Sequence, residues 1–165
     1  MAEEVIGWTR RYPILSIEDP ASQDDFATMA TVMRAIGDTV QVIGDDVLVT
    51  NAARVAGAAE AGACNAALIK VNQVGTVTEA HEALEAARAH GWGMVVSARS
   101  GETEDVTIAH LSTGWDAGQL KVGSFTRSER MAKWNEMLRI EEEMGNDADF
   151  AGASAFAAPV AARLG

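Results

Sequence analysis

Five short, mostly apolar runs recur along the chain at a nearly constant spacing. They cover residues 14–18, 40–44, 66–70, 93–97 and 119–122, and each begins 26 or 27 residues after the one before. Runs of this length without strict polar alternation are typical of strands buried on both faces of a parallel sheet. The pattern therefore predicts five parallel strands.

Stretches long enough to form helices separate and follow these runs. They cover residues 24–36, 51–60, 78–90, 103–111 and 128–144, and residues 3–11 suit the end of one more helix. Asn51 is an N-cap candidate, Glu104 and Asp105 would lie in a first helical turn, and Gly145 would end the longest helix. The alternation of strand and helix predicts right-handed crossovers between parallel strands.

A period of about 26 residues suits a βα unit of a barrel and also one of an open, doubly wound sheet. Periodicity alone leaves both architectures open. No GxGxxG or GxxxxGK[ST] motif follows any of the runs. The nucleotide-binding form of the open sheet therefore loses support.

Length and charge restrict the classes of function. The chain has 165 residues and a formal net charge of −11, which suits one domain but falls short of the roughly 250 residues of a complete TIM barrel. Binding to nucleic acid or to an anionic membrane needs a basic face. No apolar run approaches the roughly 20 residues that span a bilayer, and the first residues lack the order of a signal peptide. We therefore expect a soluble, cytoplasmic protein that binds neither nucleic acid nor membranes.

Polar or charged side chains follow each of the five runs. They are Glu18, Asp45, Lys70, Arg99 with Ser100, and Lys121. The C-terminal ends of parallel strands share one rim, where α/β proteins build active sites. Carboxylate oxygens suit Mg²⁺, basic side chains suit an anionic substrate, and a lysine partly withdrawn from water can act as a base. The alternative for any one position is an N-cap or a solvated loop residue, and Asp19, Asp24, Asp25 and Asp46 fit that role.

Other conspicuous residues have ordinary interpretations. Cys64, the single cysteine, excludes an internal disulfide and is expected to be a small packing residue. Arg127, Arg130 and Arg139 lie among acidic residues of the longest helix, and we expect them to balance those charges.

Six stretches together resemble the enolase (phosphopyruvate hydratase) family. They are SIEDP (16–20), GDDVLVTN (44–51), LIKVNQVGT (68–76), SARSGETED (97–105), GQLKVG (118–123) and RSERMAKWNEMLRIEEEMG (127–145). The similarity runs from Arg10 to Gly145, in the family's order and at about its spacing. It implies an α/β fold consisting of a partial TIM barrel of about five parallel βα units, similar to the C-terminal part of enolase. It thereby favours the barrel over the open sheet.

The resemblance also implies chemistry. Enolases are Mg²⁺-dependent lyases of glycolysis that interconvert 2-phosphoglycerate and phosphoenolpyruvate. The matching positions are Glu18 and Asp45 as Mg²⁺ ligands, Lys70 as the base that removes the C2 proton, Arg99 and Ser100 as phosphate contacts, and Lys121 as the contact for the carboxylate and developing enolate. A proton next to a carboxylate is very weakly acidic, so the intermediate needs concentrated positive charge.

The chain departs from the family pattern in three ways. The family's small N-terminal domain and first barrel strands have no counterpart here, and the third acidic Mg²⁺ ligand belongs to that part. Ala98 stands where the family has a histidine that contacts substrate. His110 stands where the family usually has an aspartate.

These matches and departures leave two functional hypotheses. The first is an enzyme, phosphopyruvate hydratase by resemblance, which acts as part of a split or assembled protein. The second is a truncated, catalytically impaired chain that serves as an association module or binds ligand without turnover. Five strands leave two open edges and part of a barrel interior exposed, so we expect self-association or pairing with a missing N-terminal part. We place the barrel domain at residues 1–145 and a loosely packed or disordered tail at residues 146–165.

Overall fold

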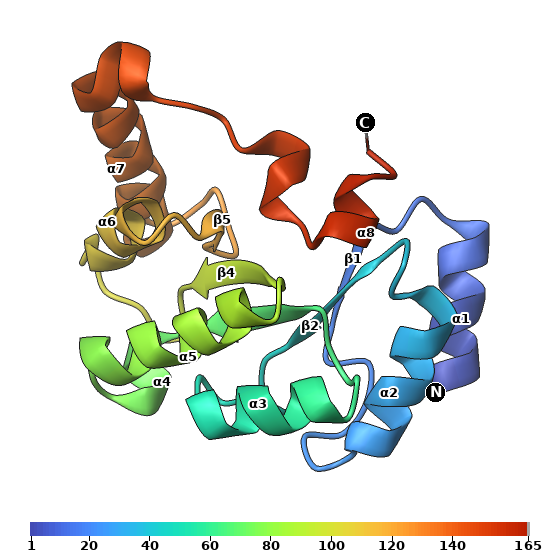
Figure 1. Cartoon of the computed structure of the whole chain (residues 1–165). Coiled ribbons are helices and arrows are strands. Elements are labelled where there is room, and N and C mark those ends of the chain that lie inside the picture. The colour runs from blue at the N-terminus through green and yellow to red at the C-terminus, as the bar shows by residue number, and fades with distance from the viewer. Residues whose placement is uncertain (165) are drawn as a thin grey trace.

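The five expected strands form one parallel sheet in which each strand pairs with its neighbours in the sequence. The computed structural model describes residues 1–164. The strands are β1 (Ser16–Glu18), β2 (Gln41–Gly44), β3 (Ala66–Ile69), β4 (Gly93–Ser97) and β5 (Gly118–Lys121). They curve into part of a barrel (Figure 1), which confirms the predicted partial TIM barrel.

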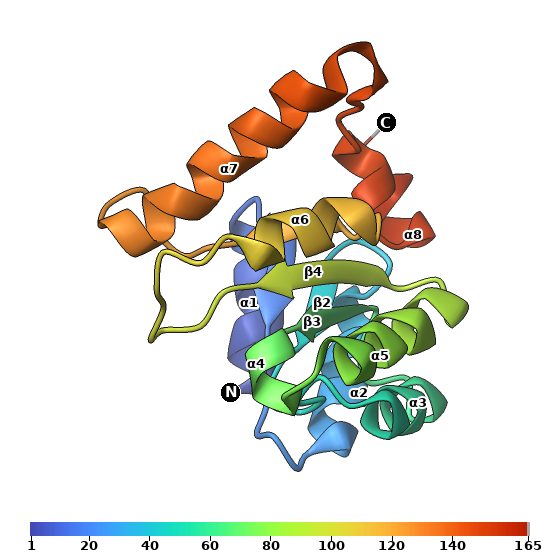
Figure 2. The same cartoon turned by 90° about the vertical axis from the view of Figure 1, so that its left-hand side faces the viewer.

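Helices follow the strands and lie outside the curved sheet (Figure 2). They are α1 (Ala2–Arg11), α2 (Phe26–Ile36), α3 (Ala52–Glu60), α4 (Val71–Val74), α5 (Val77–Ala89), α6 (Thr107–Gly114) and α7 (Ser128–Met144). Three of them begin at side chains that accept a hydrogen bond from the first turn, namely Asp25, Asn51 and Thr76. Asn51 is thus an N-cap, as predicted.

The predicted start of the helix at Thr103 is wrong, because α6 begins four residues later. Asp105 lies before the helix, where its Oδ1 accepts a hydrogen bond from the backbone N of Thr107 at 2.9 Å. That hydrogen bond holds the pKa of Asp105 below its usual value. Glu104 and Asp105 therefore lie just before the first turn of α6 rather than within it. Their negative charges still interact favourably with the positive end of the helix dipole.

Alternate residues of each strand face opposite sides of the sheet. On β3, Ala67 and Ile69 pack with the helices in the larger core, whereas Ala66 and Leu68 pack inside the curve with Ile43 and Val95. All four of these inner residues are buried. Ser16 and Glu18, on the same inward face of the edge strand β1, are exposed. The interior is therefore packed in the middle of the sheet and partly exposed at its β1 edge, as expected.

Side chains that cross the curve help to bury the middle of the interior. Near the start of the strands, Gln41 and Gln119 exchange two side-chain hydrogen bonds of 3.0 Å, which link β2 to β5. Gly93 lies beside this pair, and a Cβ there would come within 2.6 Å of the Gln41 Oε1 atom. Glycine at this position therefore lets the two amides meet.

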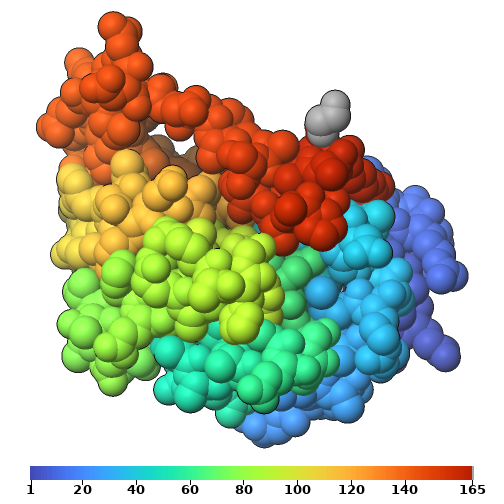
Figure 3. Space-filling model, in the orientation of Figure 1, coloured from blue at the N-terminus to red at the C-terminus, as the bar shows by residue number. Residues whose placement is uncertain are grey.

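The C-terminal segment covers the N-terminal ends of several strands. It contains the short helices η1 (Gly145–Asp147), η2 (Gly152–Ala155) and α8 (Ala158–Ala161). Gln119 Nε2 donates to the carbonyl of Ala155 at 2.9 Å, Arg163 donates to the carbonyl of Thr39 at 2.9 Å, and Val160 is buried. Figure 3 shows the segment, in red, against the rest of the chain. The division into a domain and a tail at Gly145 stays a prediction, and Gly165 lies outside the described residues.

Among the helices that the structure describes, none combines the length and apolar character needed to cross a bilayer.

Candidate functional site

The charged strand ends meet at the rim opposite the C-terminal segment. Glu18, Asp45, Lys70 and Lys121 each lie an even number of residues after an inward-facing residue of their own strand, so they share its face. A pocket of about 440 Å³ opens at this rim. Its lining includes all six predicted site residues: Glu18, Asp45, Lys70, Arg99, Ser100 and Lys121.

The pocket is basic although the chain is acidic. Five basic side chains line it against three carboxylates, in a chain whose formal charge is −11. The basic residues are Lys70, Arg99, Lys121, Arg127 and Arg130, and the acidic ones are Glu18, Asp45 and Asp46. A concave site with an excess of one sign of charge attracts ligands of the opposite sign. The pocket therefore suits an anion.

Two ion pairs connect the predicted lysines to the predicted metal ligands. Lys70 Nζ contacts Asp45 Oδ2, and both side chains are largely buried. Lys121 Nζ contacts Glu18 Oε2, which joins β5 to β1 across the pocket in a more exposed setting. Arg99 and Ser100 line the same pocket from the loop after β4. The structure thus brings all six residues together, and their roles stay predictions.

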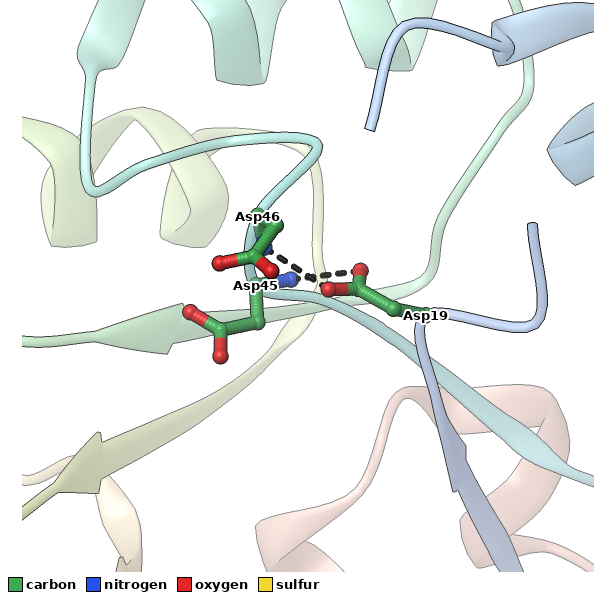
Figure 4. A group of neighbouring side chains, drawn as sticks. All are labelled: Asp19, Asp45 and Asp46. Carbon is green, nitrogen blue, oxygen red and sulfur yellow. Dashed lines mark hydrogen bonds between the residues drawn. The ribbon is translucent and has the colours of Figure 1, made fainter. Parts of the chain in front are cut away.

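Asp19 organises the loop that carries Asp45. Its two carboxylate oxygens accept hydrogen bonds from the backbone N of Asp45 at 2.9 Å and of Asp46 at 2.7 Å. Burial raises the pKa of Asp19, and the two hydrogen bonds oppose that effect. Figure 4 shows the Asp19 carboxylate directed at these amides while the Asp45 carboxylate points away from it. Asp19 is thus half-buried and holds the neighbouring loop, so it is neither the N-cap nor the solvated residue that we predicted.

Lys70 has a positioning contact that the sequence did not reveal. Thr50, which is fully buried, accepts a hydrogen bond from the backbone N of Lys70 at 3.0 Å and donates one to Gln73 Oε1 at 2.7 Å. Thr50 and Val49 have φ angles of 52° and 48°, which β-branched residues rarely adopt. The turn after β2 thus has an unfavourable backbone conformation, and this conformation places the Thr50 hydroxyl beside the backbone N of Lys70.

The chemistry of the carboxylates fits a divalent cation. Asp45 Oδ1 is buried and has no hydrogen-bond partner within the described chain. A buried carboxylate oxygen without a donor is costly, and a cation would satisfy it. One oxygen each from Asp19, Asp45 and Asp46 lie within 4.8 Å of one another. Carboxylate oxygens are ligands that Mg²⁺ prefers, so Asp45 fits this ion, although the cluster contains Asp19 and Asp46 and lacks the predicted Glu18.

The prediction for Arg130 is wrong, whereas those for Arg127 and Arg139 are confirmed. Arg127 pairs with Glu129 at 3.3 Å and Arg139 with Glu136 at 2.7 Å. The Arg130 guanidinium is buried and donates to the main-chain carbonyls of three residues, namely Arg99, Ser100 and Val122. An arginine on a charged helix gives no sequence signal for such partners, because two of them lie about 30 residues away.

Two residues beside the site contribute no reactive side chain. Ala98 is buried, belongs to the pocket lining and has no polar side-chain atom. Cys64 belongs to the larger core, and burial raises the pKa of its thiol to about 12. Cys64 is thus a packing residue, as predicted.

Comparison with known proteins gives one consistent result. The family model described as "Enolase, C-terminal TIM barrel domain" matches residues 1–159. The chain is 56% identical over 149 residues to an enolase of Solanum lycopersicum and 54% identical over 145 residues to one of Eimeria tenella. These alignments cover 90% and 88% of the chain but 33% of each relative. The chain thus spans about a third of the length of the curated relatives it matches.

Proposed function

The chain belongs to the enolase family, and from this premise we propose that it carries one side of an active site that interconverts 2-phosphoglycerate and phosphoenolpyruvate. The observation that supports the proposal is the basic pocket, because it collects all six residues that the family resemblance marks as functional. We further propose that turnover requires the barrel strands that the five described here do not include.

The protein groups have complementary tasks in this proposal. Arg99 and Ser100 bind the phosphate, because a guanidinium and a hydroxyl offer several hydrogen-bond donors to its oxygens. Lys121 binds the carboxylate, whose negative charge grows as the C2 proton leaves. Lys70 Nζ accepts that proton in one direction and returns it in the other.

Glu18 and Asp45 are the residues that would hold Mg²⁺. The buried, unpartnered Oδ1 of Asp45 supports this assignment. When bound, the ion would supply positive charge that stabilises the substrate carboxylate as it becomes more negative. Lys70 and Lys121, which pair with these carboxylates in the structure, would then be free to contact substrate.

The first experiment measures binding and turnover separately. We expect the chain to bind phosphoenolpyruvate by calorimetry when Mg²⁺ is present, and to form it from 2-phosphoglycerate only when mixed with the N-terminal part of a related enolase. Lys70→Met, which removes the proposed base, should lower turnover of the mixture by at least about 100-fold while binding persists. Leu138→Met, at an exposed position on α7, is the matched control.

The outcomes separate two candidate functions. An absence of binding and turnover, both alone and in the mixture, would contradict the proposal. Binding without turnover in the mixture would favour a binding module instead. Ala98 supports that second candidate, because it belongs to the pocket lining and its side chain cannot donate the hydrogen bond of the family's histidine.

We also propose that the chain self-associates or pairs with a complementary barrel segment, in the cytoplasm. β1 and β5 each pair on one side only, and large apolar side chains such as Leu138 and Phe150 are exposed. Unpaired strand edges and exposed apolar surface both favour association. Light scattering after size-exclusion chromatography should therefore give at least twice the monomer mass. A monodisperse monomer that unfolds cooperatively would refute this expectation.

A further inference from the structure

Helix α7 contributes two basic side chains that are almost completely withdrawn from solvent. Lys133 is 0% exposed and Arg130 is 5% exposed. Lysine and arginine are rarely buried to this extent unless every donor has a partner. Their partners lie mainly in the loop of residues 98–106, which joins β4 to α6 and has no helix or strand of its own.

Lys133 acts on this loop through Glu102. Lys133 Nζ pairs with Glu102 Oε2 at 3.0 Å and donates to the carbonyl of Thr103 at 2.8 Å. The other oxygen of the same carboxylate, Glu102 Oε1, accepts a hydrogen bond from the backbone N of Arg99 at 2.7 Å. A continuous chain of contacts thus runs from α7 through Glu102 to the main chain of Arg99.

Arg130 holds the same loop from a second direction. Its guanidinium donates to the carbonyls of Arg99 at 2.8 Å and Ser100 at 2.9 Å, and to that of Val122 at 3.0 Å. Val122 directly follows β5, next to Lys121. One side chain therefore joins the loop after β4 to the end of β5, and both segments line the basic pocket.

We propose that Lys133 and Glu102, together with Arg130, are positioning residues that fix the loop carrying Arg99 and Ser100 at the anion-binding pocket. For substrate this inference rests on the proposed function. A loop without secondary structure is otherwise free to move, and small displacements of a binding group cost affinity. The buried contacts with α7 give Arg99 and Ser100 one defined main-chain conformation before the ligand arrives.

The test removes both partners of the buried ion pair at once. The double variant Glu102→Met with Lys133→Met should remain folded, because replacing a buried pair by apolar side chains of similar size is often tolerated. It nevertheless removes the acceptor of the Arg99 amide. Arg130 stays unchanged, because its loss would leave the carbonyls of Arg99, Ser100 and Val122 without this donor. The matched control is Glu136→Met with Arg139→Met, which removes a more exposed ion pair of the same helix together with the contact of Glu136 with His110.

Three readouts decide between positioning and a merely structural role. We expect hydrogen exchange of the Arg99 amide to become at least about tenfold faster, and affinity for phosphoenolpyruvate in Mg²⁺ to fall about tenfold, which is the loss of one well-made hydrogen bond. Affinity for Mg²⁺ alone should not change, because Glu18 and Asp45 lie on other strands. The control variant should change none of these.

Each alternative result has a defined meaning. Unchanged exchange at Arg99 would overturn the proposal, as would faster exchange with unchanged affinity for phosphoenolpyruvate. If the unmodified chain binds no phosphoenolpyruvate, the proposed function fails. The exchange of the Arg99 amide then decides the positioning role by itself.

Discussion

Replacing Asn65 by alanine is expected to lower the free energy of unfolding by roughly 3–5 kcal/mol, because it leaves three buried main-chain groups without a partner. Asn65 Oδ1 accepts from the backbone N of Val42 at 2.7 Å, and its Nδ2 donates to the carbonyls of Gly37 at 2.9 Å and Val40 at 3.1 Å. The side chain is buried at the start of β3. It therefore fixes the turn between α2 and β2 against the neighbouring strand.

Urea denaturation measures this loss as a lower midpoint at an unchanged slope. Asn72→Ala, at an exposed position of the same residue type, should change stability by no more than about 0.5 kcal/mol. Asn65→Asp keeps the acceptor but replaces the two donors with an oxygen beside two carbonyls, so it should also destabilise. A loss below about 1 kcal/mol for Asn65→Ala would mean that water or a local shift satisfies the three groups.

Asn65 also illustrates what the sequence cannot reveal. An isolated asparagine before an apolar run is typical of a turn, and nothing in its neighbours indicates that its amide bonds to residues 23 to 28 positions earlier. Lys133 and Glu102 are hidden for the same reason. Lys133 lies on a helix and Glu102 in a loop, and charged side chains in both settings are normally solvated. Their burial becomes evident only when the helix and the loop are seen packed together.

The features that could be predicted are those that repeat along the chain or that occur at the same place relative to each strand. The strand signal returns every 26 or 27 residues, and hydrophobic runs of that kind leave little choice other than a parallel sheet. The six site residues were predictable because the strand ends carry them. The start of α6 was not, since Thr103, Glu104 and Asp105 suit a first helical turn as well as the loop in which they lie.

The sequence did not show how well the middle of the barrel interior is packed. Counting strands implies an open interior, because five strands cannot complete a circle of eight. The contacts that cross the curve join residues far apart in the chain: Gln41 with Gln119, and Glu18 with Lys121. Neither pair is visible in a periodic pattern, since each member is only a polar residue within or at the end of a strand.

Leu68→Ala tests how well the middle of the interior is packed. It should lower the free energy of unfolding by roughly 3 kcal/mol, within the range of 2–5 kcal/mol for buried leucines. Leu68 is 0% exposed and packs inside the curve with Ile43 and Val95. Removing most of the side chain leaves a cavity that the surrounding strands can fill only in part. Leu138→Ala, where the leucine is 64% exposed, should cost no more than about 0.5 kcal/mol.

Ile69→Ala gives the comparison that separates the two faces of the sheet. Ile69 follows Leu68 on the same strand and is equally buried, but it faces the helices in the larger core. If the five strands enclose a packed interior, both substitutions should destabilise by a similar amount, about 2–5 kcal/mol each. If water reaches the interior in solution, Leu68→Ala should lower the free energy of unfolding much less than Ile69→Ala does. A leucine side chain that stays in contact with water contributes little hydrophobic stabilisation, so its removal loses little. Urea denaturation of the two variants, measured side by side, therefore tests one question. It shows whether the five strands, with their cross-strand contacts at Gln41 and Glu18, keep water away from Leu68 without further strands.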